Sequence, residues 1–155
     1  YRSSAPGFAN AFLMLGAPQI GVRHSRRISG LRKVTRQQWD TGQIWDDEIG
    51  VSTSLSPKFA NISVPYGALI PAELDNILGA GKHVACDASS HTFLREIPQC
   101  WLTGQAAGVA AALAAAQNKR PRDIAARAIQ HELMRQGAYL SPAIEKALRP
   151  ASAAE

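Results

Sequence analysis

Small residues recur at every fourth position in one alanine-rich stretch of this chain, at Gly104, Gly108, Ala112 and Ala116. Residues four apart are neighbours on a helix surface, so these positions share one face. A glycine inside a helix costs about 1 kcal/mol relative to alanine. Two glycines on one face therefore indicate that something approaches the helix backbone closely, which is either another strand or helix in tight packing or a bound ligand.

The beginning of the same helix favours a ligand that is flat or negatively charged. Pro98 suits a first turn, where its missing N–H has no partner to lose. The unpaired N–H groups of the first turn carry about half an elementary positive charge. Phosphate is one suitable guest. A reduced flavin is another, because a fixed dipole stabilises the negative charge that reduction leaves near its N1 and C2 carbonyl.

A glycine-bearing stretch, residues 76–82 (NILGAGK), precedes this helix, and we expect a short strand at residues 77–78 that ends at the glycines. The dinucleotide-binding fingerprint requires glycine or alanine where Val84 stands. The phosphate-binding loop requires serine or threonine where His83 stands, and its first glycine position holds Asn76. The end of the strand can thus touch a cofactor, but it cannot bind a nucleotide by itself.

Basic residues gather nearer the N-terminus, where the segment from Arg23 to Arg36 holds six of the 17 lysines and arginines. The chain carries a net charge of +5, and its isoelectric point is about 9.6. The basic run is either a solvated strand and turn or an anion-binding wall for a cofactor, substrate or neighbouring chain. Nucleic acid is disfavoured, because the run lacks interleaved aromatic residues for base stacking.

The two cysteines, Cys86 and Cys100, form no CxxC motif and no Cys/His cluster. We therefore expect no metal site and no disulfide framework, with both thiols reduced and Cys86 a small buried hydrophobic residue. No apolar run reaches the length of a membrane-spanning helix, and the first residues lack the architecture of a signal peptide. A cytoplasmic location is favoured.

Local patterns indicate strands first and helices last, which is an α+β arrangement. The elements expected before residue 76 are a buried strand at 8–15, one bent or two short strands over 20–34, a helix capped by Thr35 and ending at Trp39, a turn at 40–42, and strands at 49–56 and 61–70. The elements expected after it are helices at 98–117 and 121–136, with Gly137 as the stop, a helix at 142–148 capped by Ser141, and a frayed tail at 150–155. Glycines and prolines interrupt the strands, and the first residue is not methionine. We therefore expect a piece that completes a larger structure.

The ordered motifs resemble the C-terminal, flavin-binding part of bacterial FAD-dependent oxidoreductases, whose ending reads VAGR…R-x-M-P-x-C-x-x-T-G-Q-A-A-G. The matching segments are 17–28 (APQIGVRHSRRI), 64–71 (VPYGALIP), 76–82 (NILGAGK), 95–98 (REIP) and 103–108 (TGQAAG). The resemblance runs from about residue 6 to residue 139. It implies the C-terminal portion of an FAD/NAD(P)-binding α/β flavoprotein, with FAD as the cofactor.

By this resemblance the chain divides into an irregular, β-rich substrate-side segment (1–75), a strand with flavin-facing helices (76–137), and a C-terminal helix and tail (138–155). The implied cofactor contacts are Gly81, Lys82, Arg95, Pro98, Gln99, Cys100, Thr103, Gly104, Gln105 and Ala106. Gly81 and Lys82 would lie along the ribityl and diphosphate groups. Residues 98–105 would present the helix N-terminus to the isoalloxazine ring.

The resemblance also implies that His24, Arg26 and Arg27 line the substrate side, and that His91 lies in a loop beside the cofactor. A base with a near-neutral pKa beside arginines suits the abstraction of hydride from an alcohol or amine carbon. The alternative for His24 is an ordinary surface or core histidine. His83 and His131 are expected to be structural.

Two positions depart from the family pattern. Lys82 replaces the usual arginine, which keeps the charge but loses the planar fork. Glu96 replaces an apolar residue next to Arg95, where it would neutralise part of the charge that an anion needs.

The third departure is an absence. Enzymes of this family bind the ADP half of FAD with an N-terminal strand–GxGxxG–helix unit, and nothing in this sequence matches that unit. The chain is then a C-terminal fragment, one subunit of a split enzyme, or a domain that lost catalysis. We expect it to form the flavin- and substrate-proximal portion of an oxidoreductase acting on a small molecule. It would be inactive without the missing N-terminal FAD-binding region or a partner subunit. The alternative is a non-enzymatic basic module that docks a protein or nucleic acid.

Overall fold

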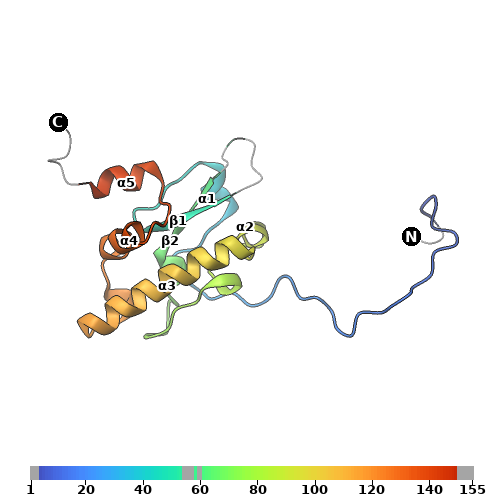
Figure 1. The fold of residues 1–155 in the computed structure, drawn as a ribbon, viewed down its shortest axis with the longest axis horizontal. Coiled ribbons are helices and arrows are strands. Elements are labelled where there is room, and N and C mark those ends of the chain that lie inside the picture. The colour runs from blue at the N-terminus through green and yellow to red at the C-terminus, as the bar shows by residue number, and fades with distance from the viewer. Residues whose placement is uncertain (1–3, 54–57, 59–60, 150–155) are drawn as a thin grey trace.

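Helix α3 (Ile97–Gln117) is the longest of the described elements, and the sheet and the C-terminal helices lie on one side of it in the view of Figure 1. The computed structural model describes residues 4–53, 58 and 61–149. Before α3 come α1 (Arg36–Asp40), β1 (Glu48–Thr53), β2 (Asn61–Pro65), the 3-10 turns η1 (Tyr66–Ala68) and η2 (Gly81–His83), and α2 (Ala88–Leu94). After it come the 3-10 turn η3 (Pro121–Asp123), α4 (Ala126–Arg135) and α5 (Pro142–Leu148). The mixed helix and strand content agrees with the expected α+β class.

Strands β1 and β2 form an antiparallel two-stranded sheet, in which Val51 pairs with Ser63 and an irregularity lies between Glu48 and Gly50. The main core gathers buried side chains from the sheet and the helices: Val34, Ile49, Ile62, Val64, Leu69, Leu94, Ala106, Val109, Ala110, Ile129 and Leu133. Helix α3 contributes small residues to this core, so the sheet and α4 come close to its backbone. None of the helices in the described ranges has the length and hydropathy needed to cross a bilayer.

The strands expected at residues 8–15 and 20–34 are wrong. Residues 11–22 run as an extended segment away from the body (Figure 1), and the side chains of residues 12–15 are between 79% and 86% exposed. A strand needs a partner for its backbone groups, and the first segment has none among the described residues. The second segment makes only single bridges, Gly30 with Pro71 and Val34 with Cys86. The expected strand at 77–78 is also absent.

The local signals at helix ends are mostly confirmed. Thr35 caps α1 by accepting a hydrogen bond from Gln38 N, and Gly137 follows α4 at φ +80°. Ser141 is the N-cap residue of α5, but its side chain makes no capping bond; its backbone N–H donates to the buried Glu48 carboxylate at 2.6 Å. Cys86 is buried, as expected, and its thiol is free.

Three further expectations need correction. The strand expected over 61–70 ends at Pro65 and continues as the turn η1. The helix expected over 121–136 is divided, since Ile124 is buried and residues 124–125 are extended between η3 and α4. Residues 89–92 form part of helix α2 instead of a loop, because the Asp87 carboxylate accepts from Ser90 N at 2.7 Å and caps the helix. The expected strand end at 54–56 and the tail at 150–155 lie outside the described residues.

Candidate functional site

The turn η2 packs against the first half of α3, which brings the two glycine-bearing motifs together. Gly81 has φ +66°, a conformation that glycine adopts without strain. Its backbone N–H donates to Thr103 Oγ1 at 2.9 Å, and a Cβ at this position would lie 3.5 Å from Cys100 Sγ. The residues of η2 and of α3 that were predicted to contact the flavin are thus neighbours in space, although they are separated in the sequence.

The first turn of α3 is open. Its N-cap residue, Glu96, makes no side-chain capping bond, and the turn holds no acidic residue. Ile97 is 64% exposed and Trp101 72% exposed, while a Cβ on Gly104 would meet nothing within 4 Å. N–H donors without a capping side chain therefore stand beside a bare stretch of helix backbone.

The four small residues spaced along α3 are all exposed. A Cβ added to Gly108 would also meet nothing within 4 Å. Tight packing of this face against a strand or helix, the alternative reading of the spacing, is therefore not seen in the described part of the chain. A shallow apolar groove follows part of the face, where Ala112 and Ala116 lie near Glu132 of α4.

Three of the ten expected cofactor residues bury their side chains in the protein, and a fourth, which is exposed, is bonded to α4 at the surface. Gln99, Thr103 and Ala106 are buried, and Gln105 Nε2 donates to Gln136 Oε1 on α4 at 3.0 Å. Gly81, Lys82, Pro98, Cys100 and Gly104 lie at the open side, fully or partly exposed.

Arg95 ends α2 and forms an ion pair with Glu96 at 3.4 Å. This pairing was expected from the acidic residue at position 96, where the family has an apolar one. The Nε of Arg95 is buried and has no hydrogen-bond partner among the residues that the structure describes. Glu96 also lies 4.0 Å from Arg23, so this carboxylate is shared between two guanidinium groups. It cannot fully neutralise either of them.

The structure brings two of the expected catalytic residues into contact. His91, fully buried on α2, has its Nδ1 3.2 Å from His24 Nδ1, and the two ring centroids lie 4.7 Å apart. Its Nε2 lies 3.0 Å from the carbonyl oxygen of Lys82 in η2. His24 belongs to the N-terminal segment, which is held to the same turn because Ile28 N donates to His83 O at 2.9 Å.

Positive charge surrounds this histidine pair. Burial lowers the pKa of His91, and nearby His24, Arg27 and Arg95 lower it further, against the opposing effect of the Lys82 carbonyl. Arg27 is half-buried and has no ion-pair partner within the ranges that the structure describes. Arg26 is exposed, and no hydrogen bond or ion pair connects it to the pair in those ranges.

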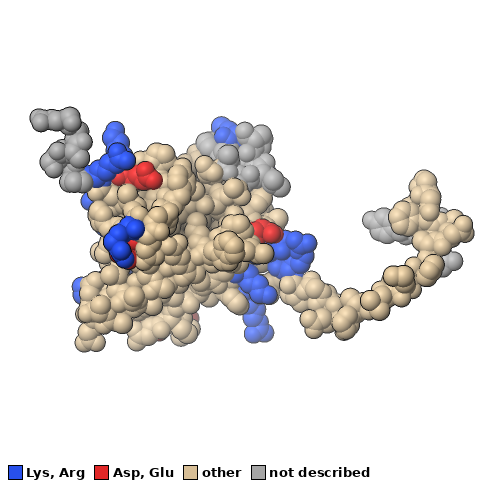
Figure 2. Space-filling model, viewed as in Figure 1, with Lys and Arg blue, Asp and Glu red and all other residues tan. Residues whose placement is uncertain are grey.

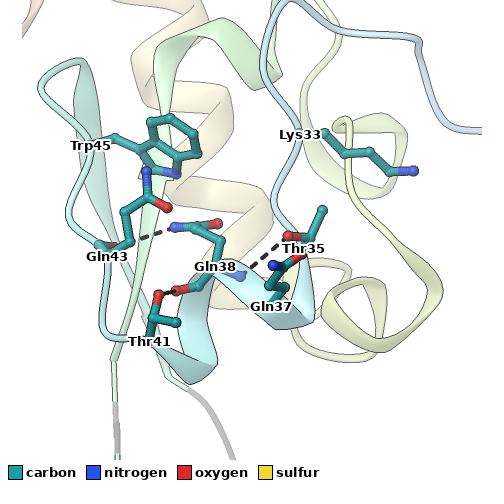
Figure 3. A pocket seen from close by; sticks show the side chains of 7 residues that line it. All are labelled: Lys33, Thr35, Gln37, Gln38, Thr41, Gln43 and Trp45. Carbon is teal, nitrogen blue, oxygen red and sulfur yellow. Dashed lines mark hydrogen bonds between the residues drawn. The ribbon is translucent and has the colours of Figure 1, made fainter.

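One pocket was not predicted from the sequence. Figure 3 shows its lining, which is almost entirely amides and hydroxyls beside one indole and one ammonium group: Lys33, Thr35, Gln37, Gln38, Thr41, Gln43 and Trp45. Gln38 Nε2 donates to the carbonyls of Gln43 and Ser63, at 3.4 and 3.3 Å, and holds α1 against the sheet. The spacing of these residues gave no sign of a pocket, and the lining described includes no histidine, cysteine or carboxylate.

Comparison with known families gave one match. The model of the family described as FAD dependent oxidoreductase matches residues 52–133, more than half of the chain. The match includes η2, His91 and α3, but it begins after His24, Arg26 and Arg27, which therefore lie outside it. Searches among curated proteins and among solved structures gave no significant match.

Proposed function

The chain belongs to the FAD-dependent oxidoreductase family, so its cofactor is FAD, and we propose that it forms the flavin- and substrate-facing part of such an enzyme. The observation that supports this proposal most directly is the packing contact between η2 and α3. The Gly81 turn lies against Cys100 and Thr103 beside a helix N-terminus without a side-chain cap, and Gly104 leaves the adjoining helix face bare.

These residues fit a flat ring that gains negative charge. The N–H groups of the first turn of α3 point out of the helix end and would stabilise that charge without reorganisation. Cys100 and Gly104 are one helical turn apart on the same face, and a side chain at Gly104 would occupy the space that the ring needs. When bound there, FAD supplies the hydride acceptor. Thr103 and the buried Gln99 and Ala106 would hold the helix in place.

On the substrate side, His24 is the group that takes a proton. As the substrate carbon loses a hydride and is oxidised by two electrons, its hydroxyl or amino group must lose one proton, which passes to the imidazole of His24. Arg27 stands beside the histidine pair without a carboxylate partner among the described residues, so it is placed to orient an anionic group of the substrate. Arg26 is exposed and would contact a more distant part of the same ligand.

The ADP half of FAD would be held by polypeptide outside these 155 residues, either upstream in a longer chain or in a partner subunit. The basis is that the sequence holds no GxGxxG unit, and that the residues of η2 and α3 would contact only the ring and the adjoining ribityl and diphosphate groups. The chain would therefore be inactive by itself.

Recognition of nucleic acid is less well supported. On the face shown in Figure 2, lysines and arginines stand in separate groups, some of them beside acidic residues, instead of in one continuous stripe. A binding surface for a nucleic acid backbone would need such a stripe.

The test is reconstitution. The chain is produced together with a GxGxxG-bearing polypeptide encoded upstream or beside it, the product is desalted, and the visible spectrum is recorded. We expect flavin absorbance that co-elutes with both parts and is absent from either part alone. Salt-sensitive binding of duplex DNA, measured by fluorescence anisotropy, with no flavin in any combination would overturn the proposal.

A further inference from the structure

The hydrogen bond between His91 and Lys82 fixes where one proton lies. A backbone carbonyl oxygen can only accept a hydrogen bond, so the Nε2 of His91, 3.0 Å from Lys82 O, must carry hydrogen. If His91 is neutral, its Nδ1 then has a lone pair and no hydrogen.

The surroundings of His91 keep it neutral. The side chain is fully buried, and burial disfavours a charged imidazole. The groups that act on it electrostatically are His24 and Arg27 from the N-terminal segment and Arg95 at the end of α2, all of them basic. Glu96, the acidic residue that follows Arg95, is paired with Arg95 and Arg23, and it is not among the groups that act on the pKa of His91.

The contact between the two histidines then has only one possible donor. His24 Nδ1 lies 3.2 Å from His91 Nδ1, and a hydrogen bond between two nitrogens requires a hydrogen on one of them. Since His91 Nδ1 has none, His24 Nδ1 must donate. A neutral imidazole carries one N–H, so the Nε2 of His24 is left with the lone pair.

We propose that His91 is a positioning residue that holds His24 in the tautomer with hydrogen on Nδ1, so that Nε2 of His24 is the proton acceptor. A histidine free in water prefers the opposite tautomer, with hydrogen on Nε2, which would place a donor where the reaction needs a base. The role of this tautomer in catalysis rests on the proposed function. The tautomer itself does not.

The same bonds connect the base to the cofactor side. Lys82 O, which anchors His91, belongs to the turn whose Gly81 N–H is bonded to Thr103 on α3. His24 is thus linked through His91 and η2 to the helix face assigned to the flavin ring. A displacement of η2 would be transmitted to the base through these bonds.

The test is nitrogen-15 NMR of the imidazole rings in the complete 155-residue chain at a pH where both histidines are neutral. Protonated and bare ring nitrogens have well-separated shifts, and the signals of His24 are identified by their loss in His24→Gln. We expect hydrogen on Nδ1 and a bare Nε2 for His24. The reverse pattern in the unmodified chain would overturn the proposal, even if a variant fails to fold.

Two variants of His91 separate its two bonds. In His91→Asn the amide oxygen takes the place of Nδ1 and can still accept from His24, so His24 keeps its tautomer. In His91→Gln the amide nitrogen takes the place of Nε2 and retains the bond to Lys82, but the acceptor is lost, so His24 reverts to hydrogen on Nε2. An unchanged tautomer in His91→Gln would contradict the proposal. No flavin is present in this experiment, so its outcome is independent of whether the chain contributes to an FAD site.

Discussion

Gly81 and Thr103 are joined by a hydrogen bond of 2.9 Å from the backbone N–H of the glycine to the hydroxyl oxygen of the threonine. The same hydroxyl donates to Gln99 O at 2.8 Å. One fully buried side chain thus links the turn η2 to the interior of α3. The relative position of the two cofactor-facing elements depends on this group.

Replacing Thr103 with valine keeps the shape of the side chain and removes both bonds. The backbone N–H of Gly81 is then left without its partner, which should lower the free energy of unfolding by about 1–3 kcal/mol. Urea denaturation followed by circular dichroism measures the loss. Thr103→Ser, which retains the hydroxyl, is the matched control and should lie close to the unmodified chain. Equal losses in the two variants would show that the hydroxyl is not what ties η2 to α3.

The two cysteines should react very differently. Burial raises the pKa of the Cys86 thiol to about 11, so only about one molecule in a thousand carries the thiolate at pH 8. Cys100 is partly exposed beside Gly81. We expect iodoacetamide to label Cys100 alone in the folded chain and both thiols after denaturation, as read by peptide mass spectrometry. In the assembly that holds flavin, Cys100 should be protected, and rapid labelling there would place the ring elsewhere.

Asp87 should stabilise the fold most strongly near neutral pH. Its carboxylate accepts from Arg36 N and Ser90 N, both at 2.7 Å. Partial burial raises its pKa, but these bonds outweigh that effect and leave the pKa below its ordinary value. A depressed pKa in the folded state means that the stabilisation is complete above the unfolded pKa of about 3.9. It is lost as the pH falls through the folded value.

Asp87→Asn should therefore cost about 1 kcal/mol at pH 7, since a neutral amide makes weaker bonds to the two N–H groups. The difference from the unmodified chain should shrink below about pH 4, where Asp87 itself becomes protonated. Urea unfolding at several pH values measures both the loss of stability at pH 7 and its decrease at low pH. Asp40→Asn, at an exposed ion pair with Arg36, is the control and should change little. If the loss of stability in Asp87→Asn stays constant with pH, the ionised Asp87 carboxylate is not what stabilises the two N–H groups.

The features that could be predicted from the sequence are those that local spacing determines. Helix α3 starts and ends within one residue of the expected positions, because proline opens it and its alanine-rich run carries the periodicity. The cap at Thr35 and the left-handed Gly137 follow from single residue types. The class of cofactor followed from ordered motifs around η2 and α3, and the family match covers both.

The features that could not be predicted depend on partners far along the chain. The apolar run at residues 12–15 has the composition of a buried strand, yet a strand forms only where another backbone is available, and the described chain offers none. Helix α2 is short and polar, and it depends on one capping carboxylate at Asp87. His24 and His91 are 67 residues apart, so no local pattern could show that their rings meet.

The most direct test of the account is flavin retention in Gly104→Leu, measured in the reconstituted assembly after desalting as the ratio of flavin to protein absorbance. Nothing lies within 4 Å of a Cβ at this position, and leucine favours a helix over glycine by roughly 0.8 kcal/mol. The variant should therefore fold at least as stably as the unmodified chain and should lose its flavin. Ala116→Leu, about 18 Å further along the helix, should keep it. Full flavin occupancy in a folded Gly104→Leu would show that this face of α3 does not contact the ring.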